Sequence, residues 1–148
     1  MRSPFVSRPW LLVVFMFAVN PALLLAGEQT LESEQAFELS ADLKDAETVR
    51  LSWNIADGYY LYRQKFKFVS LTPGPRLGEP LFPVGQSRQD KSLGLVEVYR
   101  ESLELELPIR PPAAKAEPLS LEVTFQGCAD AGFCYMPVKK VITLDLSD

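Results

Sequence analysis

Short runs in which apolar and polar residues alternate are the feature that most limits how this chain can fold. A period of two puts successive side chains on opposite faces of a β-strand, so that one face of each run can be buried. The clearest run is 119–125, where four apolar residues alternate with Ser120, Glu122 and Thr124. Comparable runs cover 37–43, 49–55, 59–69, 95–99, 103–107 and 138–146. We therefore predict about seven short strands.

The rest of the pattern defines the fold class. The sequence has no convincing amphipathic helix and no internal repeat. Between 71 and 90 the alternation gives way to prolines and glycines, which predicts a long irregular excursion. Many short strands without helices are typical of an antiparallel β-sandwich of immunoglobulin-like type, and we predict that all-β fold.

The first 26 residues have the composition of a secretory signal peptide. Arg2 and Arg8 precede an apolar run from Trp10 to Val19, and small residues follow at Ala26 and Gly27. The apolar run is shorter than the roughly 20 residues that a spanning helix needs. We therefore expect residues 27–148 to be one exported, soluble domain in the periplasm, where disulfides persist.

Charge and composition exclude several function classes. The chain carries a net charge of −4, and removal of the signal would take away two arginines and no acidic residue, so nucleic acid is not an expected partner. Histidine is absent, which excludes histidine-based triads and disfavours the usual zinc and copper(II) ligand sets. We expect neither a metal nor a cofactor.

The only two cysteines, Cys128 and Cys134, lie directly after the strand predicted at 119–125. Five residues separate them, which is enough for a compact turn that brings the sulfurs together, and Gly127 and Gly132 could supply positive φ angles there. A bridge that closes so small a ring stabilises by only about 2.4 kcal/mol in the chain-entropy estimate. A stabilising bridge and a redox-active pair both remain open, and the small ring favours the redox pair.

Three motifs carry a resemblance to a known family. The segments QGCADAGFCYMP (126–137), DGYYLYR (57–63) and EVYR (97–100) resemble the amino-terminal periplasmic domain of the thiol:disulfide interchange protein DsbD. The resemblance implies an immunoglobulin-like oxidoreductase domain that accepts electrons from the thioredoxin-like carboxy-terminal domain of DsbD. It implies that the domain reduces thioredoxin-fold proteins such as DsbC and a cytochrome c maturation factor.

The resemblance also implies different roles for the two cysteines. Cys134 matches the cysteine that forms the mixed disulfide with a partner, and Cys128 matches the one that resolves it. Phe133 and Tyr135 flank Cys134 and offer aromatic surface that a partner could cover. Thiol exchange through a mixed disulfide needs this asymmetry, because one sulfur must be accessible while the other waits.

Supporting residues are implied by the same match. Tyr60 and Tyr62 correspond to aromatic residues beside the cysteine pair, with ordinary strand packing as the alternative. Asp90 corresponds to an acidic residue of the family's cap loop, where a carboxylate near the sulfurs could influence thiol protonation. A solvated loop carboxylate is the alternative for Asp90.

The sequence departs from the family in its cap loop. The family places an aromatic residue there to cover the disulfide, whereas this chain has Lys91, Ser92, Leu93 and Gly94. The membrane domain and the carboxy-terminal domain of DsbD have no counterpart in these 148 residues. We expect any membrane link, and the electron donor, to come from a further part of the protein or from a separate chain.

Two other function classes remain open. An exported binding module would use the sandwich surface for adhesion or assembly and would keep the disulfide permanently closed. A copper(I) carrier would use Cys128, Cys134 and Met136 as soft sulfur ligands. Reduction potential separates the first class from an exchange domain, because structural bridges resist reduction below about −300 mV.

Overall fold

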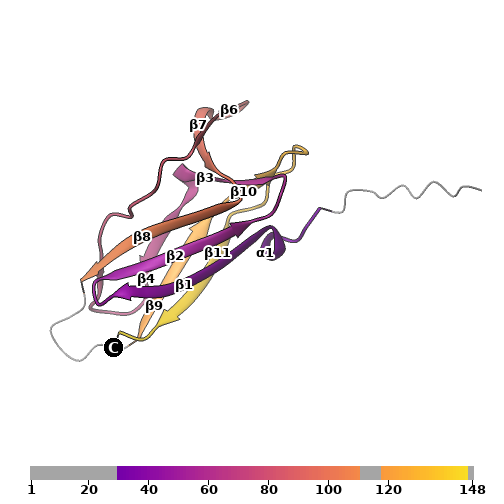
Figure 1. The fold of residues 1–148 in the computed structure, drawn as a ribbon. Helices are drawn as coiled ribbons and strands as arrows, with labels where there is room; N and C mark the ends of the chain where they lie inside the picture. The colour runs from indigo at the N-terminus through magenta and orange to yellow at the C-terminus, as the bar shows by residue number, and fades with distance from the viewer. Residues whose placement is uncertain (1–29, 111–117, 147–148) are drawn as a thin grey trace, which may run out of the picture.

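The computed structural model describes residues 30–110 and 118–146, which form layers of antiparallel strands (Figure 1). The elements in chain order are α1 (Ser33–Ala36), β1 (Phe37–Asp45), β2 (Thr48–Ile55), β3 (Tyr59–Tyr62), the 3₁₀ helix η1 (Arg63–Lys65), β4 (Lys67–Ser70), β5 (Arg76–Leu77), β6 (Gln86–Asp90), β7 (Gly94–Tyr99), β8 (Ser102–Arg110), β9 (Leu119–Phe125), β10 (Gly127–Ala129) and β11 (Val138–Leu144).

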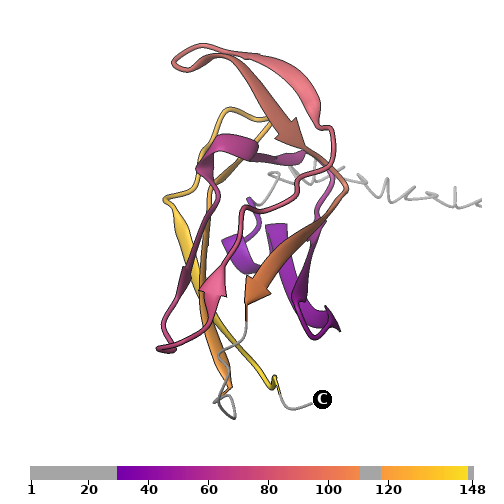
Figure 2. The same cartoon turned by 90° about the vertical axis from the view of Figure 1, so that its left-hand side faces the viewer.

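The strands are arranged in three antiparallel sheets. One has the order β1-β2-β8-β5, and a second, behind it in Figure 1, has the order β11-β9-β4. The third sheet, β10-β3-β7-β6, lies at one end of the sandwich and carries the β6–β7 hairpin beyond it (Figure 2). The predicted antiparallel β-sandwich of immunoglobulin-like type is confirmed.

Alternation of side chains builds the main core between the two larger sheets. All four apolar residues of β9 are fully buried, while Ser120, Glu122 and Thr124 between them are only partly buried. Trp53 of β2 and Phe125 of β9 meet edge to face with ring centroids 5.8 Å apart. Burying a side chain of this kind contributes roughly 1.5–3 kcal/mol, so these strands supply much of the hydrophobic stabilisation.

The segment 59–69, predicted as one strand, is two strands separated by a helical turn. η1 occupies Arg63–Lys65, and β3 and β4 on either side of it belong to different sheets. The three residues of η1 are polar and exposed, so the chain can turn there without losing core contacts. The strand-forming residues on both sides gave no sign of this break.

The excursion predicted between 71 and 90 contains two strands. The short β5 pairs with β8, and β6 pairs with β7 over five residues, from Gln86 opposite Val98 to Asp90 opposite Gly94. Because all five residues of β6 are polar, no alternation marks it in the sequence. The predicted cap loop is therefore the outer part of a β-hairpin, with its turn at 91–93.

A second, smaller buried cluster lies between the hairpin and β10. It consists of Tyr60, Tyr62, Val96, Val98 and Cys128, each no more than 6% exposed. These residues come from β3, β7 and β10, which are neighbours in the small sheet. One of the two cysteines is therefore held inside a packed cluster, and this cluster positions the functional site.

The predicted signal peptide lies outside the described residues, so its boundary at residue 26 stays a prediction. Within residues 30–110 and 118–146, no helix has the length and apolar character needed to cross a membrane.

Gly127 gives the first testable prediction. A Cβ atom at this position would lie 2.5 Å from the carbonyl oxygen of Tyr60 and would also collide with the ring of Phe37. We expect Gly127→Ala to lower the free energy of unfolding by about 1–3 kcal/mol, the usual range for overpacking. Urea unfolding of the oxidised protein measures the change.

Gly94→Ala is the matched control for this prediction. Gly94 has a φ of 76°, but a Cβ added there would meet no atom within 4 Å. The control therefore carries only the cost of a positive φ, about 1 kcal/mol. A loss for Gly127→Ala no larger than that for Gly94→Ala would contradict the packing argument.

Candidate functional site

A disulfide joins Cys128 and Cys134 across a small antiparallel turn. The two Cα atoms are 4.0 Å apart. Backbone hydrogen bonds lie on either side of the pair: Ala129 N–H to Phe133 O at 2.7 Å, and Tyr135 N–H to Gly127 O at 3.0 Å. This pattern makes the cysteines a non-hydrogen-bonded pair, the position at which facing side chains of antiparallel strands come closest.

The two glycines of the motif have different roles. Gly132 has a φ of 93° and supplies the left-handed conformation that the turn needs. Gly127 was expected to do the same, but its φ is not positive and this expectation is wrong. Its lack of a side chain instead lets β10 approach Tyr60 and Phe37 closely.

The two sulfur-bearing residues differ sharply in exposure. Cys128 is 1% exposed and packs in the small cluster, whereas Cys134 is exposed. The difference follows from the backbone, since Cys128 pairs with Tyr60 inside the small sheet and Cys134 lies on the outer arm of the turn. An external thiolate can therefore approach the sulfur of Cys134 and not that of Cys128.

Tyr60, Tyr62 and Asp90 lie together beside Cys128. The rings of Tyr60 and Tyr62 meet edge to face with centroids 5.4 Å apart. The hydroxyl of Tyr62 donates to Asp90 Oδ2 at 2.7 Å, and its oxygen lies 3.6 Å from Cys128 Sγ. The motif-based expectation for these three side chains thus has a geometric basis, with Tyr62 between the carboxylate and the sulfur.

The pKa values of Tyr62 and Asp90 are both shifted so that Tyr62 stays protonated and Asp90 stays ionised, which are the forms that make this hydrogen bond. Burial, followed by the contacts with Tyr60 and Asp90, raises the pKa of Tyr62, which keeps its hydroxyl protonated. The hydrogen bond from Tyr62, followed by those from the backbone of Leu93 and Ser92, lowers the pKa of Asp90. Asp90 is therefore a carboxylate that accepts hydrogen bonds near neutral pH.

The residues expected in the cap form the tip of the β6–β7 hairpin. The backbone N–H groups of Ser92 and Leu93 both donate to Asp90 Oδ1 at 2.8 Å, and Gly94 closes the turn with a positive φ. Ser92 is exposed and Leu93 is 45% exposed. Asp90 thus accepts hydrogen bonds from the turn backbone at Oδ1 and from the Tyr62 hydroxyl at Oδ2.

Tyr135 anchors the chain directly after Cys134. Its hydroxyl donates to the backbone oxygen of Leu31, whose N–H donates to the hydroxyl of Tyr59 at 2.9 Å. Its ring meets Phe133 edge to face at 4.8 Å. Burial, followed by the contact with Tyr59, raises the pKa of Tyr135 to about 12. Phe133 itself is 48% exposed beside the disulfide.

Charged residues fasten the middle of the cysteine turn. Arg100 donates two hydrogen bonds to Asp130, at 2.8 and 2.7 Å, and this contact holds the pKa of Asp130 below its usual value. Arg88 of β6 also donates to Asp130, at 3.2 Å, and its guanidinium lies 4.3 Å from the centroid of the Tyr60 ring. Sequence reasoning singled out neither Arg88 nor Asp130, because their roles appear only once the hairpin lies beside the turn.

The comparisons with known proteins place this geometry in a family. Residues 27–146 match the family model described as "Thiol:disulfide interchange protein DsbD, N-terminal". The chain is 40% identical over 121 residues to thiol:disulfide interchange protein DsbD 1 of Pseudomonas aeruginosa, covering 82% of this chain and 20% of that protein. It is 42% identical over 112 residues to DsbD of Klebsiella pneumoniae, covering 76% and 18%. The chain therefore spans about a fifth of the length of these relatives.

Solved structures agree with the sequence relatives. The reduced amino-terminal domain of DsbD from Neisseria meningitidis is 32% identical, with a TM-score of 0.70 over 78% of this chain and 89% of that one. A structure of the complex between the DsbD and PilB amino-terminal domains of the same organism is 31% identical, with a TM-score of 0.61 over 78% and 87%.

The contact between Tyr62 and Asp90 gives a prediction about pH. Because the ionised carboxylate accepts the bond, its stabilising contribution is full above about pH 3.8 and is lost as the pH falls through the lowered pKa of Asp90. We expect Tyr62→Phe to raise the pKa of Asp90 toward 3.8, with part of the lowering kept by the two backbone donors. NMR titration of the Asp90 carboxyl carbon in the oxidised protein measures this pKa.

Tyr60→Phe is the control, because the Tyr60 hydroxyl contacts Tyr62 and is not among the groups that lower the pKa of Asp90. The pKa of Asp90 in Tyr60→Phe should therefore equal that in the wild type. An unchanged pKa of Asp90 in Tyr62→Phe would show that the hydroxyl contributes nothing to the carboxylate.

Proposed function

Because the chain belongs to the family of DsbD amino-terminal domains, we propose that it is a periplasmic thiol-disulfide exchange domain. It takes electrons from a thioredoxin-like donor and passes them to oxidised thioredoxin-fold proteins through a reversible Cys128–Cys134 disulfide. The observation that carries the proposal is the difference in exposure between the two cysteines, because Cys128 is 1% exposed whereas Cys134 lies at the surface. Exchange requires one reachable sulfur and one that resolves.

Reduction of the domain begins with attack on the exposed sulfur. A donor thiolate bonds to Cys134 Sγ, the bond to Cys128 Sγ breaks, and Cys128 leaves as a thiolate that takes up a proton. The second donor thiolate then attacks the donor's own sulfur in the mixed disulfide, and Cys134 leaves as a thiolate. The donor dithiol becomes a disulfide, and the domain gains two electrons and, once the Cys134 thiolate is also protonated, two protons.

Delivery of electrons to a client runs the same chemistry in the other direction. The Cys134 thiolate attacks the client disulfide, and one client sulfur leaves as a thiolate. The Cys128 thiol then gives up its proton, and the resulting thiolate attacks Cys134 Sγ, which reforms the Cys128–Cys134 bond. The second client sulfur leaves as a thiolate, and the two client thiolates take up two protons to give the client dithiol. Cys128 never needs to contact the client, which is compatible with its burial in the small cluster.

Tyr62 and Asp90 are positioned to act on the resolving cysteine. In the reduced domain the Cys128 thiol can donate its proton to the Tyr62 oxygen, 3.6 Å away, because the hydroxyl proton of Tyr62 is directed at Asp90. This arrangement gives the thiol a defined partner and stabilises it until a mixed disulfide forms. The carboxylate acts through the tyrosine and is a positioning group in this scheme.

The surface around Cys134 suits a protein partner. Phe133 and Met136, which lie within two residues of Cys134 in the chain, are 48 and 82% exposed, and Leu93 at the tip of the hairpin is 45% exposed. Apolar and aromatic side chains of this kind form the contact centres of protein interfaces. The solved complex of a relative with the PilB amino-terminal domain supports a protein partner. We propose the carboxy-terminal domain of DsbD as donor, and DsbC-like and cytochrome c maturation proteins as clients.

The roles of the two cysteines can be tested by trapping. We expect Cys128→Ser to accumulate a covalent complex with an oxidised thioredoxin-fold client, because its Cys134 thiolate can attack but no thiol remains to resolve the product. Cys134→Ser should give no such complex. Non-reducing electrophoresis after mixing each reduced variant with the client measures the adduct.

Wild-type protein mixed with a reduced donor is the control and should lose its disulfide without a lasting adduct. Equal trapping by both variants would contradict the assigned roles. A wild-type disulfide that stays closed in excess donor would favour a permanently bridged binding module.

The missing aromatic in the cap gives a prediction about access. A ring at position 92 could pack over the disulfide, and burying a ring contributes about 2 kcal/mol, enough to slow attack by roughly tenfold or more. We expect Ser92→Phe to slow reduction by dithiothreitol and Leu93→Ser to accelerate it. Stopped-flow reduction of the oxidised variants, with melting curves for each, measures both effects.

Leu95→Ser is the matched control. Leu95 is 74% exposed on the same hairpin, and it lies in the groove on the face opposite the disulfide. Its rate of reduction should equal that of the wild type. If Leu93→Ser only lowers the melting temperature and neither cap variant changes the rate, the cap does not control access.

A further inference from the structure

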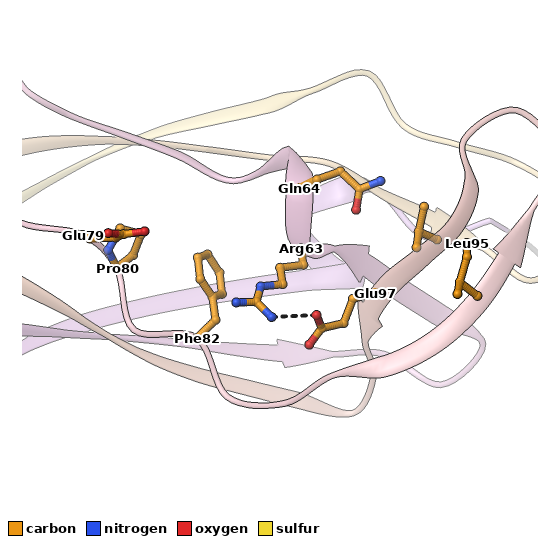
Figure 3. A pocket seen from close by; sticks show the side chains of 8 residues that line it. Arg63, Gln64, Glu79, Pro80, Phe82, Leu95 and Glu97 are labelled. Atoms are coloured by element: carbon orange, nitrogen blue, oxygen red, sulfur yellow. Dashed lines mark hydrogen bonds and ion pairs between the residues drawn. The ribbon is translucent and has the colours of Figure 1, made fainter.

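The β6–β7 hairpin is fastened on both of its faces. On the face away from the disulfide, Arg63 of η1 pairs with Glu97 at 2.6 Å in a groove of about 510 Å³ (Figure 3). The same carboxylate accepts the backbone N–H of Gly85 at 2.6 Å, and Arg63 lies over the ring of Phe82. These contacts hold the base of the hairpin against the sandwich.

The face toward the disulfide is fastened by two different contacts. One is the hydrogen bond from Tyr62 to Asp90, near the tip of the hairpin. The other is Arg88, which bonds Asp130 inside the cysteine turn and stacks on Tyr60. Arg88 pairs with Val96 across the hairpin, so its side chain shares a face with a residue of the cluster that buries Cys128.

Arg88 and Arg100 share the same two partners but join different parts of the structure. Both guanidinium groups lie near the Tyr60 ring, at 4.3 and 5.0 Å, and both bond Asp130. Arg100 follows β7 at its base and also donates to the backbone oxygen of Tyr59, so it ties the turn to the body of the sandwich. Arg88 ties the outer strand of the hairpin to the same turn.

We propose that Arg88 is a specificity-determining residue for the exchange reaction, which keeps the sulfur of Cys128 out of reach so that external thiols react only at Cys134. The inference rests on the proposed function and adds to it the residue that decides which sulfur is attacked. With Arg88 in place, the hairpin covers Tyr60 and the cysteine behind it. Without Arg88, the bond from Tyr62 to Asp90 is the one side-chain hydrogen bond among the described residues that still holds β6 on this face.

The choice of sulfur matters because attack on the wrong one changes the product. If a thiolate bonded to Cys128 Sγ, Cys134 would leave as the thiolate and the partner would be joined to the buried position. A thioredoxin-fold partner is too large for its sulfur to reach the buried Cys128, whereas a small thiol is not too large to reach it. Arg88 would therefore protect the site from small thiols without hindering protein partners at Cys134.

The experiment measures how reachable each cysteine is in the reduced protein. Reduced wild type, Arg88→Gln and Arg63→Gln are alkylated under native conditions, once with iodoacetamide and once with a maleimide carrying a bulky polymer. Mass spectrometry of the peptides gives the rate at each cysteine. Arg63→Gln is the matched control, because it breaks an exposed ion pair on the other face of the same hairpin.

We expect Arg88→Gln to raise the Cys128-to-Cys134 ratio of alkylation rates about three- to tenfold, as loss of an exposed ion pair and a cation–π contact would allow. The increase should be larger for iodoacetamide, because the bulky reagent remains too large for the buried position, and Arg63→Gln should leave the ratio unchanged. Sodium chloride at about 1 M should raise the ratio in wild type and not in Arg88→Gln, because salt screens the ion pair. Arg88→Lys keeps the charge but loses the planar stack on Tyr60, so its ratio of alkylation rates should lie between those of wild type and Arg88→Gln.

Several results would overturn the proposal. The first is an unchanged ratio in Arg88→Gln, and the second is an equal rise in Arg63→Gln, which would reflect general loosening of the hairpin. A third is an equal rise in the Cys128-to-Cys134 ratio for both reagents in Arg88→Gln, which would show that Arg88 alters the reactivity of the thiol and not access to it. Because no partner protein takes part, a failure here differs from failed trapping by Cys128→Ser, which would overturn the exchange function itself.

Discussion

The antiparallel pairing of Tyr60 with Cys128 is the contact on which the geometry of the redox site depends. It places one cysteine inside a sheet and beneath a hairpin, while the short turn returns the other to the surface. Two chemically identical residues thereby acquire different environments, because the backbone pairing places Cys128 among the buried side chains of the small cluster and leaves Cys134 outside it. Gly127 makes the pairing possible, because a side chain there would collide with the carbonyl group of Tyr60.

The fold was predictable wherever one face of a strand is buried and the other is not. Alternation identified the core strands, including β9, because a period of two follows directly from burial on one face. The polar strand β6 gave no such signal, since it pairs at the edge of a small sheet and carries no apolar residue. The break at η1 was also missed, because residues typical of strands, many of them aromatic, stand on both sides of it.

Motif resemblance identified the centre of the site, and tertiary structure supplied the rest. The cysteines, Tyr62 and Asp90 were named from the sequence, and the structure brings them together. Arg88 could not have been identified in this way, because its partners are 28 and 42 residues away in the chain and meet it only through the hairpin. Long-range ion pairs of this kind leave no pattern in a single sequence.

The bond between Tyr135 and Leu31 determines where other polypeptides can be joined to this domain. Leu31 is held beside the residue that follows Cys134, so an affinity tag or fusion partner attached just ahead of it would emerge close to Cys134 and could shield it from the proposed protein partners. The end of β11 lies at the opposite end of the sandwich from the hairpin (Figure 1). A second domain tethered there would leave the disulfide uncovered, and a flexible connection of sufficient length could still bring it back to the disulfide.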